Sequence, residues 1–153
     1  MPPKPILWLI DTSILVNILN FPDFNQDYEK VIKDFEERIK NGDTFLIPYA
    51  TFVETGNHLA KLKGNLRFEF AKIFSKLVLS VLAQEAPFRA LQFPDAEIIQ
   101  EWIQDFPDDA AKGISFTDFT IIKEWEMQKD RYPAFSVRIW SLDDHLQGYD
   151  SES

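Results

Sequence analysis

The apolar run Ile6–Ile10 stops at an acidic residue, Asp11, and this feature restricts the fold more than any other. Five consecutive apolar residues predict a strand that is buried on both faces, as in parallel sheets covered by helices. Thr12 or Ser13 is then a candidate N-cap for a helix that begins near Ile14. This order of buried strand, polar turn and helix predicts an α/β fold.

The rest of the chain repeats the alternation of strand and helix. Further strands are expected at residues 44–47, 88–93 and 135–142, where apolar and β-branched side chains are concentrated. Further helices are expected at residues 28–40, after Pro48, at 66–82, at 96–103 and after a cap at Ser115 or Thr117. Residues 106–109 are expected to form a loop. The alternation predicts a mostly parallel sheet with right-handed crossovers.

A single domain over residues 1–153 is expected, because 45% of the chain is hydrophobic and no low-complexity linker interrupts it. The chain contains no cysteine, which excludes disulfides and thiolate metal ligands and favours a reducing compartment. The apolar run near the N-terminus is too short for a signal peptide or a membrane span. We therefore expect a soluble cytoplasmic protein.

Acidic residues outnumber basic ones by 25 to 16, which gives a formal net charge of −9. Binding of nucleic acid through a uniformly basic surface is therefore excluded. A site in which carboxylates bind metal remains compatible with nucleic acid, because the cation reverses the local charge. Candidate local contacts for a polyanion are Lys61, Lys63 and Arg67, or Lys112 and Lys123, although each is better explained as a solubilising surface residue.

Four acidic residues are expected where strands end and helices begin: Asp11, Glu54, Asp118 and Asp143. In open parallel sheets these positions face one crevice beyond the carboxyl ends of the strands. Asp144 is a rival of Asp143, because an error of one residue in the strand end would exchange them. Any one such residue is more often a cap or a turn residue, so that only the set is informative.

Four carboxylates in one crevice repel one another unless a cation neutralises them. Mg²⁺ or Mn²⁺ prefers oxygen ligands, and either ion would support hydrolysis of a phosphodiester bond. The candidate metal ligands are Asp11, Asp118 and Asp143, and Glu54 is a further ligand or positions the attacking water. Four polar residues are candidates for hydrogen bonds that hold the carboxylates in place: Thr12, Ser13, Asn17 and Ser141.

Four short acidic motifs occur in the order found in PIN domains: Ile10-Asp11-Thr12-Ser13, Val53-Glu54, Thr117-Asp118-Phe119 and Ser141-Leu142-Asp143. The chain thus resembles the PIN-domain ribonucleases over nearly its whole length. The resemblance implies a three-layer α/β/α sandwich with four or five strands in the order 3-2-1-4, and cleavage of RNA with Mg²⁺ or Mn²⁺. It also implies similarity to VapC-like toxins, which bind an antitoxin protein and form homodimers. The chain ends ten residues after Asp143, so we expect a fifth strand to be short or missing.

Two other functions are compatible with parts of the sequence. A phosphohydrolase of the haloacid-dehalogenase type also begins with a strand that ends in Asp, but its second Asp is replaced here by Ser13. A PIN-like module without catalysis could bind RNA or protein. The presence of all four carboxylates argues against this module, because the carboxylates repel one another and a fold without catalysis would gain nothing from them.

Overall fold

The computed structural model of the chain describes residues 3–89 and 93–150. Its centre is a parallel sheet of β1 (Ile6–Ile10), β2 (Thr44–Leu46) and β3 (Ser136–Trp140), in the order β2-β1-β3. Leu9 of β1 is in register with Leu46 on one side and Ile139 on the other. The first strand of the chain is therefore the central strand.

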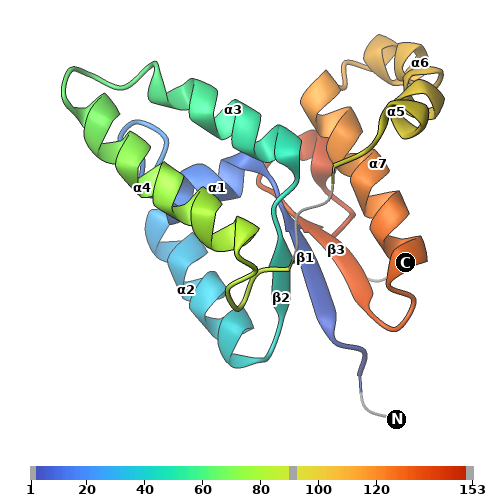
Figure 1. Cartoon of the computed structure of the whole chain (residues 1–153), viewed down its shortest axis with the longest axis horizontal. Helices are drawn as coiled ribbons and strands as arrows, with labels where there is room; N and C mark the ends of the chain where they lie inside the picture. The colour runs from blue at the N-terminus through green and yellow to red at the C-terminus, as the bar shows by residue number, and fades with distance from the viewer. Residues whose placement is uncertain (1–2, 90–92, 151–153) are drawn as a thin grey trace.

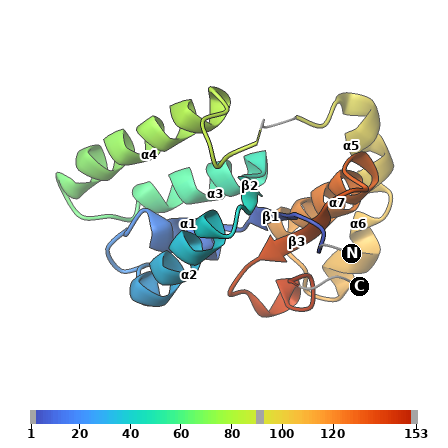
Figure 2. The same cartoon turned by 90° about the horizontal axis from the view of Figure 1, so that it is seen from below.

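The helices are α1 (Thr12–Ile18), α2 (Tyr28–Lys40), α3 (Tyr49–Leu59), α4 (Leu66–Leu82), α5 (Ala96–Ile103), α6 (Phe106–Ala111) and α7 (Phe116–Arg131), followed by the 3₁₀ helix η1 (Asp144–Leu146). Figure 1 shows α1 to α4 on one side of the sheet and α5 to α7 on the other, and Figure 2 shows the same arrangement from below. Within the described residues, no helix has the length and apolar character needed to cross a membrane.

Successive residues of β1 point to opposite faces of the sheet and divide the core into two parts. Trp8 and Ile10 belong to a cluster formed with α1 and α2. Leu7 and Leu9 belong to a second cluster, which includes Ile121 of α7. Helices thus cover both faces, which explains why the strand is apolar throughout, and the predicted α/β class with a parallel sheet is confirmed.

The described residues form three strands, whereas four or five were expected. Beside β2, Phe88 makes an isolated parallel bridge with Phe45, and residues 90–92 of the candidate strand 88–93 lie outside the described residues. Pro87 has no N–H to extend this ladder. Beside β3, the N–H of Ile139 donates to the carbonyl of Tyr149 at 2.7 Å. The segment at Phe88 lies beside β2, where the order 3-2-1-4 would place the third strand. The segment at Tyr149 lies beside β3, where a short fifth strand would lie.

Two local expectations are wrong. Neither Thr12 nor Ser13 caps α1, because Asp11 occupies the N-cap position and its carbonyl accepts the first N–H groups of the helix. The segment expected as a loop begins α6 instead. Pro107 lies in the first turn of α6, where its missing N–H is not needed. Asp108 lies in the same turn, and its negative charge interacts favourably with the positive end of the helix dipole.

Candidate active site

Asp11 follows β1 and is buried, with 3% of its surface exposed. Its N–H donates to the carbonyl of Trp140 at 3.1 Å, which connects the ends of β1 and β3. Its Oδ2 accepts hydrogen bonds from the hydroxyls of Ser13 at 2.9 Å and Ser141 at 2.7 Å. Burial raises the pKa of Asp11 above its ordinary value, although these hydrogen bonds oppose the change.

The chain after β3 is held by the same two hydroxyls. The N–H of Leu142 donates to Ser13 Oγ at 2.9 Å, and the N–H of Asp143 donates to Ser141 Oγ at 2.9 Å. The first bond joins the segment after β3 to the start of α1, and the second is local to that segment. They place Asp143 beside Asp11 although the two residues come from opposite ends of the chain.

Asp143, and not its neighbour Asp144, faces the site. The carboxylate of Asp143 accepts the N–H of His145 at 2.8 Å and so caps η1. Asp143 lines the cavity described below, whereas Asp144 is the first residue of η1 and does not line it. The geometry therefore separates two residues between which the sequence left the choice open.

One cavity of about 350 Å³ contains three of the four predicted carboxylates, those of Asp11, Glu54 and Asp143. Glu54 reaches it from the second turn of α3. The other lining residues are Thr12, Ser13, Val16, Asn17, Phe24, Gln26, Asp27, His58 and Leu142. Carboxylates from the ends of β1 and β3 and from α3 therefore converge, as the sequence predicts.

Asp118 lies beside the same three carboxylates. Ser115 caps α7, as predicted, by accepting the N–H of Asp118 on its hydroxyl at 3.1 Å. The pKa of Asp118 is raised to about 7, and burial is the largest cause. The charges of Asp143, Asp11 and Glu54 add to this rise, and so does a hydrogen bond with Asp143 that favours the protonated form. The four predicted acidic residues thus form one electrostatic group.

The predicted supporting residues act in different ways. Both serine hydroxyls bond to the Asp11 carboxylate, as predicted. The hydroxyl of Thr12 is buried and has no hydrogen-bond partner among the residues that the structure describes, and the backbone N–H of Thr12 bonds to the carboxylate instead. The amide of Asn17 contacts no carboxylate, because it donates to the carbonyl of Ser13 at 2.8 Å and accepts the N–H of Asp27 at 3.0 Å. Asn17 therefore joins α1 to the segment before α2.

The donor set of the cavity fits a hard divalent cation better than a soft one. Carboxylate and hydroxyl oxygens dominate, and neither lysine nor arginine is among the described residues that line it. No three Asp, Glu or His side chains of the described residues are arranged as ligands of one ion. Mg²⁺ is often bound through one or two carboxylates and several waters. An oxygen-rich cavity is therefore compatible with Mg²⁺ even though the side chains of its described residues are not arranged as three ligands of one ion.

Sequence analysis did not assign six of the lining residues to a site, and among them are the two aromatic side chains of the cavity, Phe24 and His58. His58 lies four residues after Glu54 on α3, and this spacing places both on one helix face. The spacing could therefore have identified His58. Phe24 lies between α1 and α2, and no local pattern distinguishes it from a core residue.

Most of the basic candidates are engaged by nearby groups. Lys123 contacts Asp105 at 2.8 Å, and Lys112 lies 4.0 Å from Asp109. The guanidinium of Arg67 donates through Nε to the backbone carbonyl of Leu62 at 2.6 Å. These contacts fit the interpretation of the residues as local surface groups.

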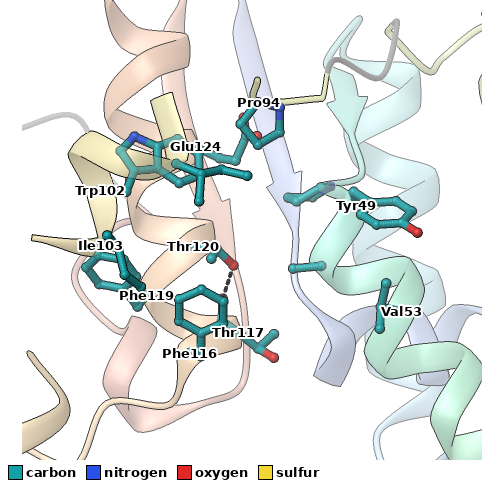
Figure 3. A pocket seen from close by; sticks show the side chains of 13 residues that line it. Tyr49, Val53, Pro94, Trp102, Ile103, Phe116, Thr117, Phe119, Thr120 and Glu124 are labelled. Carbon is teal, nitrogen blue, oxygen red and sulfur yellow. Dashed lines mark hydrogen bonds between the residues drawn. The ribbon is translucent and has the colours of Figure 1, made fainter. Parts of the chain in front are cut away.

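A second cavity, of about 320 Å³, lies between α3, α5 and α7 and is lined mainly by apolar side chains (Figure 3). Tyr49 and Val53 line it from α3, and Trp102 and Ile103 line it from α5. Val53 is 45% exposed. Glu124, which is almost fully buried, is its acidic member, and burial raises its pKa. Apolar surface of this kind often marks contact with another molecule.

No family model matches the sequence, and no curated protein matches it. Among solved structures, the fold is similar to that of a chain in VapBC2 from Rickettsia felis, which was crystallised with a DNA fragment from their promoter. The two chains share a fold. The TM-score is 0.51 at 18% sequence identity, and the match covers 88% of this chain and 99% of the other. The likeness concerns the fold alone.

Proposed function

We propose that this protein is a metal-dependent endoribonuclease that hydrolyses RNA phosphodiester bonds, and that it is the cytoplasmic toxin of a toxin–antitoxin pair. One observation carries the proposal: the carboxylates of Asp11, Glu54 and Asp143 line one cavity. The raised pKa of Asp118, to which the charges of these three groups contribute, agrees with this arrangement. Titratable groups perturbed in this way cluster at functional sites. A chain with a net charge of −9 also needs local neutralisation before it can approach a polyanion.

Asp11 and Asp143 would hold Mg²⁺ or Mn²⁺ directly, and Asp118 would do so directly or through a water molecule. When bound, such an ion stabilises charge on the phosphate and lowers the pKa of a water molecule. Asp118 must release its proton to take part, since carboxylates bind metal in the ionised form. Hydrogen bonds from Ser13 and Ser141 keep the Asp11 carboxylate oriented during this exchange.

Glu54 would position the water that attacks phosphorus, or act as a further ligand. It lies on α3 and lines the cavity together with the two carboxylates that follow β1 and β3. From that position it can accept a hydrogen bond from the attacking water and direct its lone pair at the phosphate. The phosphorus–oxygen bond opposite the incoming water then breaks.

Cleavage of a fluorescently labelled single-stranded RNA by the purified protein tests the proposal. We expect cleavage with Mn²⁺, none with EDTA, and a loss of about 100-fold or more in Asp11→Asn and Asp143→Asn. Asp144→Asn is the matched control, because Asp144 is the adjacent carboxylate outside the cavity. Cleavage that survives both active-site substitutions would contradict the assignment. Absence of cleavage by the wild-type protein would favour a PIN-like module without catalysis.

The apolar cavity in Figure 3 supports two further parts of the proposal, an antitoxin partner and a homodimer. Tyr49 and Val53 are both exposed beside it, so that a partner could cover apolar surface there. The structural neighbour VapBC2 was itself solved as a complex. Co-purification from the native host with the product of the adjacent gene tests the antitoxin. Light scattering that finds only monomers at micromolar concentration would contradict the homodimer.

A further inference from the structure

Phe24 and His58 form an aromatic pair in the wall of the cavity that holds Asp11, Glu54 and Asp143. Their rings are stacked, with centroids 4.5 Å apart and planes inclined by 17°. Neither ring has a role in the chemistry proposed above. An aromatic surface beside carboxylates in the same cavity needs its own explanation.

Both rings are held in position by the fold. His58 lies one helical turn beyond Glu54 on α3, so its ring reaches the same side of the helix. Phe24 packs partly against the core beneath α1 and α2, and its N–H donates to the carbonyl of Phe21 at 3.0 Å. The pair is therefore a fixed part of the wall and is already arranged before any ligand binds.

The orientation of His58 leaves one nitrogen for a ligand. Within the described residues, Nδ1 is buried and has no hydrogen-bond partner. Burying an unpaired N–H there would be costly, so the proton of the neutral ring belongs on Nε2. Burial and the charge of Lys61 lower the pKa of His58, whereas Glu54 opposes this change, so the environment favours the neutral ring. Neutral His58 is thus a hydrogen-bond donor through Nε2.

We propose that Phe24 and His58 form the subsite for the nucleotide next to the phosphate that is cut. The nucleobase packs against the aromatic pair, and Nε2 of His58 donates to an oxygen of the same nucleotide. The inference rests on the proposed ribonuclease function. Phe24 and His58 position the RNA, and the carboxylates carry out the hydrolysis.

The charge of the cavity favours this kind of contact over ion pairing. Asp27 adds a fourth acidic residue to the lining, and the described lining residues include neither lysine nor arginine. Base stacking on an aromatic side chain does not depend on charge, and every base has a π-face. RNA can therefore gain affinity here even though its phosphates meet a mostly acidic surface.

Steady-state cleavage of RNA with Mn²⁺ provides the first test. Phe24→Leu and His58→Leu are each expected to raise KM about tenfold while kcat stays within about twofold, because stacking contributes to binding. Phe24→Tyr keeps the ring and should retain the wild-type KM. Phe68→Leu is the matched control, since Phe68 is 66% exposed on α4 and lines neither cavity.

A fluorescent base provides the second test, which separates stacking from misfolding. RNA that carries 2-aminopurine at each position in turn is bound to the cleavage-deficient Asp143→Asn protein. We expect quenching at one position, and loss of that quenching when Phe24→Leu is added, with an unchanged melting temperature. Unchanged KM and quenching in the leucine variants would overturn the subsite, as would a loss confined to kcat. A wild-type protein that cleaves no RNA would instead overturn the ribonuclease function on which the subsite rests.

Discussion

The hydroxyl of Ser141 lies 2.7 Å from Oδ2 of Asp11, although the two residues are 130 positions apart in the sequence. The same hydroxyl accepts the N–H of Asp143 at 2.9 Å. One small side chain at the end of β3 therefore positions two of the four carboxylates. Because β1 and β3 are adjacent parallel strands, the bond between Ser141 and Asp11 forms only when the sheet forms.

Ser141→Ala is expected to weaken Mn²⁺ binding and RNA cleavage by about 10- to 100-fold. The substitution removes the shorter hydrogen bond to Asp11 and leaves the N–H of Asp143 without its acceptor. Calorimetric titration with Mn²⁺ and the cleavage rate measure the two effects. Ser75→Ala, at an exposed position of α4, is the matched control. A Ser141→Ala protein with wild-type Mn²⁺ affinity would show that the hydroxyl does not support the site.

Asp118→Asn is expected to stabilise the metal-free protein at high pH. The pKa of Asp118 is about 7 in the folded state against an ordinary value of 3.8, so the folded state binds the proton more tightly than the unfolded chain does. The wild-type protein therefore loses stability as the pH rises from 3.8 to about 7. Asparagine remains neutral, and since one pKa unit corresponds to about 1.4 kcal/mol, its advantage should reach about 4 kcal/mol above pH 7. Urea unfolding in EDTA at pH 4 and pH 8 measures the difference, which would be constant if Asp118 were not perturbed.

Mn²⁺ is expected to raise the melting temperature of the wild-type protein, and more strongly at pH 8 than at pH 5. A ligand that binds only the folded state stabilises the folded state. At pH 5 the ion competes with the proton on Asp118, so it binds more weakly and stabilises less. Differential scanning fluorimetry measures both shifts. Asp143→Asn should lose most of the shift at pH 8. An equal shift in this variant would place the ion outside the proposed site.

Leu9→Ala is expected to lower the free energy of unfolding by about 2 to 5 kcal/mol. Leu9 is fully buried in the central strand, where it packs in the cluster that includes Ile121 and Ile139. Leu79→Ala makes the same chemical change at a side chain that is 66% exposed on α4. This control should lose less than about 0.5 kcal/mol. Similar midpoints of urea unfolding for the two variants would contradict the central position of β1.

Val53→Asp is expected to weaken self-association or antitoxin binding about tenfold or more, because it places a charge on the apolar surface that a partner would cover. Val53 is 45% exposed beside the cavity of α3, α5 and α7, so the folded monomer should tolerate the change. Light scattering and co-purification measure the two associations. Ser75→Asp on α4 adds the same single negative charge at an exposed position that does not line this cavity, and is the control. Unchanged association would show that partners bind elsewhere.

Elements with a strong local pattern could be predicted from the sequence. The strand Ile6–Ile10 and the helix Tyr28–Lys40 have the expected bounds, because the spacing of apolar residues reflects the faces that each element covers. The helix that contains Pro107 was missed, since proline is compatible with a first helical turn as well as with a loop. The number of strands was also missed, because edge pairing depends on partners that are distant in the sequence.

The sequence by itself determined where Asp11, Glu54, Asp118 and Asp143 stand along the chain, since each follows a strand or lies near the start of a helix. Only the tertiary structure decided which other side chains join them. Phe24 and His58 meet because α1, α2 and α3 pack on one face of the sheet. The physical reason is that local patterns set the direction of a side chain within its own element, whereas distances between elements depend on how their buried faces pack.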